Sequence, residues 1–119
     1  MARLKLNAWG QENEVGFSIE KYANNSNLAI QMWSWVEGCY EGGVKLDGYY
    51  EPWSVLTVNL MEKCKSNCAF IDTNNNGDDI IFWLTKNNLG KLTDRFAQSG
   101  FCIYPEFEFN MDELNKYLI

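Results

Sequence analysis

The chain has 119 residues, 16 acidic against 10 basic side chains, a net charge of −6, and no histidine. Histidine is the usual general base and metal ligand near neutral pH, so its absence argues against most enzyme and metal chemistry. The acidic balance argues against direct binding of a phosphate backbone, which requires a basic surface, and is compatible with a basic protein partner.

The length fits one domain over residues 1–119. The N-terminus carries charge but no continuous apolar stretch, which argues against a signal peptide. No apolar run approaches the ~20 residues that cross a bilayer, so no membrane contact is expected. We therefore expect a cytoplasmic protein with reduced cysteines, at Cys39, Cys64, Cys68 and Cys102.

Alternating apolar and polar residues predict the first three strands. Residues 3–9 and 14–22 alternate on either side of a turn predicted at residues 10–13 and are expected to form a hairpin. A third strand is predicted over 28–36. Its core face carries Leu28, Ile30, Met32 and Val36, and its opposite face carries Ala29, Gln31, Trp33 and Trp35.

Residues 37–51 are rich in glycine and acids and predict a long hairpin loop. Pro52 is suited to the start of a strand, and fourth and fifth strands are predicted over 53–60 and 69–73.

The C-terminal third predicts helices and one more strand. Residues 74–77 indicate a turn, followed by a helix of about twelve residues that ends before Gly90. Residues 91–100 are expected to be a connector. A strand over 101–109 alternates, with Phe101, Ile103, Phe107 and Phe109 on one face and Cys102, Tyr104, Glu106 and Glu108 on the other.

Pro105 makes this last strand an expected edge strand, and a short helix capped by Asn110 is predicted over 111–118. The sum is an α+β fold, in which an antiparallel sheet of five or six strands carries one main helix on a face and a short C-terminal helix follows.

Two patterns resemble metal sites without completing one. Asp72, Asn74, Asn76 and Gly77 match the first half of a calcium loop, but the twelfth position is a tryptophan instead of a bidentate glutamate. Cys64 and Cys68 would need two further ligands, and the cysteine spacing does not suggest that all four converge. We expect no bound metal and no cofactor, with the first pattern serving as an acidic turn into a helix.

Catalytic patterns are also weak. The chain has no serine–histidine or cysteine–histidine pair and no phosphate-binding glycine loop. Glu106 and Glu108 would share one face of a strand, so a glycosidase-like dyad is conceivable, but a solvated face is the favoured interpretation. The protein is not expected to be an enzyme.

The remaining signal is aromatic and acidic. Trp33, Trp35, Trp53 and Tyr104 could share the sheet face opposite the core, where tryptophan and tyrosine favour protein interfaces. The alternative is that the main helix covers this face and makes it a second core.

Four segments, 22–31, 51–60, 70–76 and 99–109, together resemble a family of small proteins of unknown function carried on conjugative elements and plasmids of Gram-positive bacteria. The resemblance covers most of the chain and brings no catalytic residues with it. It implies a mobile-element setting, in which small acidic proteins include inhibitors of Cas9-type nucleases. Such nucleases hold guide and target in positively charged channels, for which an acidic protein can compete.

Two acidic groups are the expected partner-binding residues, and the aromatic face adds four more. The first group is Glu37, Glu41, Asp47 and Glu51, and the second is Glu106, Glu108, Asp112 and Glu113. The leading hypothesis is a non-enzymatic inhibitor that binds a Cas9-type nuclease and blocks guide loading or DNA access. The alternatives are an accessory interaction module of a conjugative element and a small carboxylate-dependent enzyme. The oligomeric state remains open.

Overall fold

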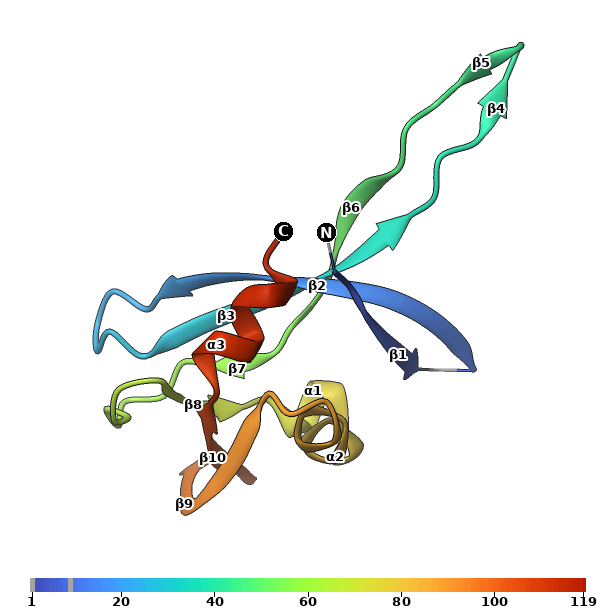
Figure 1. Cartoon of the computed structure of the whole chain (residues 1–119). Helices are drawn as coiled ribbons and strands as arrows, with labels where there is room; N and C mark the ends of the chain where they lie inside the picture. Colours follow the sequence, from blue (N-terminus) through green and yellow to red (C-terminus); the bar gives the residue numbers. More distant parts are fainter. Residues whose placement is uncertain (1, 9) are drawn as a thin grey trace.

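The computed structural model describes residues 2–8 and 10–119, so the part of the first predicted strand that includes Trp9 lies outside the described residues. The fold is a mostly-β α+β arrangement of three antiparallel sheets and three short helices (Figure 1). The strands are β1 Leu4–Ala8, β2 Gln11–Lys21, β3 Leu28–Val36, β4 Tyr40–Glu41, β5 Val44–Lys45, β6 Tyr49–Val55, β7 Thr57–Val58, β8 Cys68–Ile71, β9 Gly90–Ser99 and β10 Cys102–Phe109. The helices are α1 Thr73–Asn76, α2 Asp79–Lys86 and α3 Met111–Leu114, with a 3₁₀ turn at Asn115–Tyr117.

The first sheet has the strand order β1-β2-β3-β6. The long strand β2 pairs with β1 through its first half and with β3 through its second half. Val15 and Phe17 on β2 and Ile30 and Met32 on β3 are fully buried, as their alternation predicted. Val36, predicted for the same core face, is only half-buried because it lies where β3 leaves the body of the protein.

The second sheet has the order β7-β8-β10-β9, so the prediction of one five- or six-stranded sheet is wrong. The chain crosses between the two sheets at Leu56, whose N–H donates to the Ile30 carbonyl on β3. The Leu56 carbonyl instead accepts from the N–H of Asp72, which follows β8. Leu56 is thus a corner that serves both sheets, and its side chain is fully buried between them.

Two predictions about the second sheet are corrected. Residues 91–100, expected to be a connector, lie almost entirely in β9. β10 lies between β8 and β9 and is therefore not an edge strand. The ladder tolerates Pro105 because its register shifts between Pro105 and Phe107, where β9 has a bulge.

The helices are shorter than predicted. α2 spans eight residues instead of about twelve, and the expected turn before it contains the single-turn helix α1. Ile80 and Leu84 on α2 are buried in the core, whereas Phe82 points to solvent. The C-terminal helix is confirmed, and the Asn110 side chain accepts from the Glu113 N–H at its start. Within residues 2–8 and 10–119, the helices are all too short to cross a bilayer.

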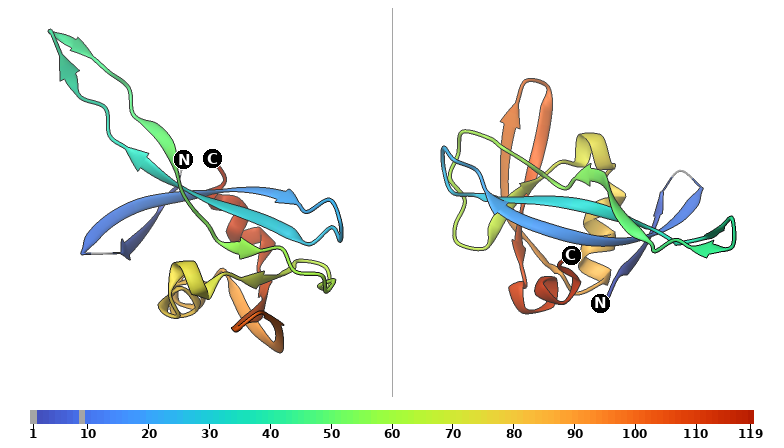
Figure 2. Two further views of the ribbon diagram at one scale, coloured as in Figure 1. Left: turned by 180° about the vertical axis from the view of Figure 1, so that it is seen from behind. Right: turned by 90° about the horizontal axis from the view of Figure 1, so that it is seen from above.

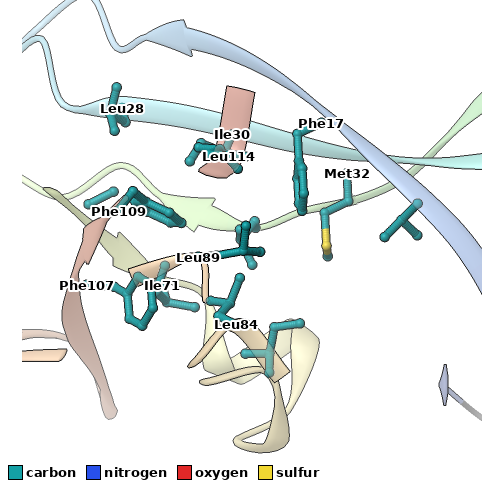
Figure 3. Close-up of a cluster of buried hydrophobic side chains, with 14 of the residues drawn as sticks. Phe17, Leu28, Ile30, Met32, Ile71, Leu84, Leu89, Phe107, Phe109 and Leu114 are labelled. Carbon is teal, nitrogen blue, oxygen red and sulfur yellow. The ribbon is translucent and has the colours of Figure 1, made fainter. Parts of the chain in front are cut away.

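The main core lies between the two sheets (Figure 3). The first sheet contributes one apolar face, and α2, the second sheet and α3 close the other side (Figure 2). Its fully enclosed side chains are Val15, Phe17, Ile30, Met32, Leu56, Ile71, Leu84, Leu89, Phe107 and Leu114.

A smaller cluster covers part of the opposite face of the second sheet. It contains Cys64, Cys68, Phe70, Ala97 and Tyr104, against which Val58 of β7 and Leu60, just after β7, pack. The alternation predicted for 101–109 is found in β10, with Phe107 facing the main core and Tyr104 the smaller cluster, but the core does not extend along the whole face. Phe107 and Phe109 are in the main core, but Phe101 and Ile103 lie beyond its limit and are exposed.

Candidate functional site

Residues 37–51 form a β-hairpin that projects from the body and gives the molecule its long axis (Figures 1 and 2). We call it the β-arm. Val36 pairs with Tyr49, and Tyr40 pairs with Lys45, with three residues between these positions on each side. The arm therefore continues the register of the β3–β6 ladder outward. The molecule extends over 53 × 27 × 25 Å along its principal axes.

The end of the arm is a two-residue turn. Gly42 and Gly43 have φ values of +59° and +81°, and positive φ at both central residues defines the type I′ turn that suits a twisted hairpin. Behind the turn, the Leu46 N–H donates to the Cys39 carbonyl at 2.6 Å. The loop predicted over this segment is thus an ordered ribbon.

Two glycines allow the strands to approach each other near the start of the arm. A Cβ on Gly38 would collide with the Leu46 carbonyl oxygen, and one on Gly48 would collide with the Trp35 ring. We call this part of the arm the neck. The close approach of the two strands requires glycine at both positions. From composition alone, these two glycines indicated only a loop.

Aromatic and charged contacts brace the neck on the body side. The Trp35 and Tyr50 rings meet edge-to-face with centroids 4.9 Å apart. The Arg3 guanidinium lies 4.4 Å from the Trp35 ring centroid, a cation–π arrangement. A hydrogen bond to the Tyr50 side chain raises the pKa of Arg3. The Trp35 Nε1 donates to Glu37 at 3.0 Å.

The arm carries four acidic side chains, Glu37, Glu41, Asp47 and Glu51, against the single basic Lys45. All four acids are exposed, and none forms an ion pair with any residue in the described ranges 2–8 and 10–119. Elsewhere six acids have basic partners, namely Glu12, Glu14, Glu62, Glu106, Glu108 and Glu113. The arm therefore concentrates uncompensated negative charge.

The arm also exposes apolar surface that the sequence did not single out. Tyr40, Val44, Leu46 and Tyr49 are 76%, 60%, 42% and 56% exposed. Tyr40 pairs with Lys45 and Val44 with Glu41, so apolar and charged side chains are mixed on both faces. A ribbon of two strands with little covered surface is marginal by itself, and the arm leaves these four apolar side chains open to solvent.

The second predicted acidic group does not join the arm. Glu108 pairs with Lys91 at 3.8 Å, and Glu113 pairs with Lys116 at 2.8 Å, which raises the pKa of Lys116. Asp112 lies in the first turn of α3, where a carboxylate meets the positive end of the helix. These residues lie on β10 and α3, on the body of the protein, and form a separate surface from the arm.

Glu106 was predicted to face a binding partner, but its side chain is only 1% exposed. Its Oε1 accepts from the Thr93 hydroxyl at 2.6 Å and its Oε2 from Arg95 at 2.7 Å. Thr93 and Arg95 lie in the bulge of β9, which brings both donors to the carboxylate. Arg95 also donates to Glu62 at 3.2 Å. Glu106 is therefore a buried structural carboxylate instead of a partner-facing one.

The predicted aromatic face is not assembled either. Trp33 donates from Nε1 to the Ser18 hydroxyl at 2.7 Å and is half-buried beside Trp35 on β3. Trp53 packs against the main core, and Tyr104 lies in the smaller cluster of the second sheet. The four rings belong to three different environments, because Trp53 packs towards the main core from the same sheet as Trp33 and Trp35, and Tyr104 lies on the second sheet.

The acidic turn at Asp72 has a structural role. Its side chain accepts from the Asn75 N–H at 3.0 Å and from the Asn75 amide at 2.7 Å, capping α1. The structure brings together no group of three or more metal-binding side chains within residues 2–8 and 10–119. Cys64 and Cys68 are both free thiols, and burial, followed by the hydrogen bond to Glu106, raises the pKa of Cys64 to about 12.

An open groove of about 1440 Å³ runs between β1 and the α1–α2 pair. Its walls include Trp53, Trp83 and Phe82 together with the amides of Asn74–Asn76. The Trp83 Nε1 donates to the Lys5 carbonyl at 2.7 Å and joins the two walls across the groove. The groove is thus partly closed by a contact within the protein.

The fold and its site define a small α+β protein with a projecting acidic arm. Residues 16–118 match the family described as Domain of unknown function (DUF4313), and the chain belongs to that family. The matched range includes the arm, the neck and the second sheet, and it leaves out β1. Comparisons with curated proteins and with solved structures found no match.

Proposed function

We propose that the protein is a non-enzymatic binding protein, and that its β-arm contacts a basic nucleic-acid-binding surface of another protein. The observation that carries the proposal is the concentration of exposed, unpaired acids on a narrow projection. A two-stranded ribbon is thin enough to enter a groove that normally holds a nucleic acid strand. The acids then replace phosphates as partners for lysine and arginine.

Charge distinguishes this partner from the alternatives. A nucleic acid would be repelled by Glu37, Glu41, Asp47 and Glu51. Two arms laid against each other would bring eight like charges together, since each arm carries four acids. A basic protein surface would attract the acidic arm, and this attraction would also raise the association rate. Both the affinity and the rate should fall as the salt concentration rises.

The exposed aromatics of the arm supply the second part of the contact. Tyr40 and Tyr49 bury large area at low entropic cost when they bind a protein. Charge complementarity mainly raises the association rate and orients the two proteins, whereas buried aromatic rings slow dissociation of the complex. The arm combines both on one ribbon of fifteen residues, 37–51.

The resemblance to mobile-element proteins selects the first partner to test, a Cas9-type nuclease. Its guide and target lie in positively charged channels, and a bound arm would block guide loading or DNA access. The arm supports this proposal through its charge and its width. The body of the protein, which is wider than the arm, then limits how deeply the arm enters.

A DNA-cleavage assay with matched variants tests the proposal. The arm variant carries Glu37→Gln, Glu41→Gln, Asp47→Asn and Glu51→Gln. The control carries Glu20→Gln, Asp78→Asn, Asp79→Asn and Asp94→Asn, four exposed acids without ion pairs in the described structure. Both sets change the net charge equally, so only position differs.

The wild-type protein and the control are expected to inhibit cleavage, and the arm variant is expected to lose inhibition. Adding the protein before the guide RNA separates a block of guide loading from a block of DNA entry. Absence of inhibition by the wild-type protein in either order would overturn the nuclease as partner. Equal loss in both variants would show that total charge, and not the arm, is responsible.

A further inference from the structure

Residues 96–105, at the end of the β9–β10 hairpin, contain no charged side chain. We call this segment the hairpin tip. Three of its apolar side chains are prominent, because Phe96 is 61%, Phe101 106% and Ile103 60% exposed. The tip projects away from the β-arm (Figures 1 and 2). An acidic protein therefore has one neutral, apolar projection.

The apolar face of the tip continues the face that forms the main core. Ile103, Pro105 and Phe107 alternate onto the same side of β10, and Phe96 lies opposite Pro105 on β9. The first sheet covers Phe107, which is fully buried, but does not reach Phe96 or Ile103. The core face thus extends beyond its cover at this hairpin.

The strand at this surface is also an open edge. β9 is the last strand in the order β7-β8-β10-β9, so no strand of the described chain pairs with its outer side. The bulge at Thr93–Arg95 protects the first half of this edge. The second half, from Phe96 to Ser99, is regular, uncharged and suited to pairing with another strand.

We propose that two copies of this chain associate through the hairpin tip in a symmetric contact. A chain of net charge −6 repels its own copy, and the tip is a surface at which two copies meet without bringing acids together. A two-fold contact is self-complementary, so the same neutral patch serves both sides. Antiparallel pairing of the two β9 edges would join the second sheets into one.

The available area predicts a weak dimer. An exposed aromatic side chain offers roughly 200 Å², so the three side chains contribute on the order of 450 Å² per copy. Two copies then bury about 900 Å², about a quarter less than the ~1,200 Å² at the lower limit of standard stable interfaces. Dimerisation is therefore expected to depend on concentration. The two arms remain free and could engage a partner together.

Sedimentation equilibrium of the purified chain over about three decades of concentration tests this proposal. The average mass is expected to rise towards that of a dimer. Phe101→Glu and Ile103→Glu should each weaken association by about tenfold or more, because each places a charge in the contact. Phe82→Glu is the matched control, since Phe82 on α2 is 71% exposed and lies outside the tip. It should leave association unchanged.

Salt gives a second readout, because a neutral contact between acidic molecules should strengthen when salt screens their repulsion. Melting curves check that the variants fold, which is expected because Phe101 is fully exposed. A monomer at every concentration would overturn the proposal, as would a dimer that survives both tip variants. Binding of a different protein to the tip of a monomeric chain would also overturn it. These measurements need no nuclease, so they are independent of the proposed function.

Discussion

Replacement of Glu106 by glutamine tests the assignment of this residue to structure. The carboxylate is 1% exposed and accepts from Thr93 at 2.6 Å and from Arg95 at 2.7 Å. Hydrogen bonds to a charged group contribute about 1.5–3 kcal/mol, and glutamine keeps one accepting oxygen. Arg95 retains Glu62 and is 41% exposed, so the cost stays below the ~3–5 kcal/mol of a fully buried broken pair. We expect a loss of about 2 kcal/mol.

Urea denaturation measures this loss directly, and the melting temperature should fall by about 5–10 °C. Glu62→Gln is the control, because Glu62 is the exposed partner of the same arginine and its own side chain is 55% exposed. It should cost no more than about 0.5 kcal/mol. A Glu106→Gln protein as stable as the wild type, or a Glu62→Gln protein equally destabilised, would refute the reasoning.

Four further predictions concern the neck, the thiols and the cap of α1. Gly48→Ala should disorder the arm, because the alanine methyl group would collide with the Trp35 ring. Backbone hydrogen exchange should accelerate in residues 37–51, with little change in melting temperature. An unchanged exchange rate in these residues would contradict the prediction. Iodoacetamide at pH 8 should modify the exposed Cys39 well before Cys64, and mass spectrometry follows the two modification rates. Equal rates at the two thiols would contradict this prediction. Since the pKa of Cys64 rises from 9.0 to about 12 on folding, the free energy of unfolding should decline across that pH interval. Asp72→Ala should cost about 1 kcal/mol in denaturation experiments, with Asp72→Asn closer to wild type, and a neutral Asp72→Ala would argue against the cap.

The strands of the first sheet were predictable because one face is buried and the other is not. Val15, Phe17, Ile30 and Met32 fall on one side at a period of two, and this pattern survives in any arrangement of the sheet. β9 was not predicted because Ala97 is the one buried residue along its length. Its sequence therefore shows no alternation of apolar and polar residues. The division into two sheets depends on the corner at Leu56, which is set by contacts distant in sequence.

The candidate site was predictable in composition but not in form. Acids and glycines marked 37–51, yet the glycine-to-ring contact that orders the neck exists only when Gly48 meets Trp35 in space. Glu106 was misplaced for the same kind of reason, since its donors come from a bulge that sequence alternation does not reveal. Phe101 and Ile103 were predicted on one face with Phe107 and Phe109, but the period of the pattern cannot show where the covering sheet ends and leaves the first two exposed.

Cross-linking from the β-arm identifies the molecules that the arm contacts. A photoreactive label on Cys39, the exposed thiol in the arm, reports what the arm touches in a host lysate or with a purified Cas9-type nuclease. The same label on Phe82→Cys, with Cys39→Ser, reports the opposite part of the body as a control. Our account predicts cross-links from Cys39 to basic nucleic-acid-binding proteins, lost in the arm variant and absent from position 82. Equal cross-linking from both positions, or cross-links that persist without the four arm acids, would contradict it.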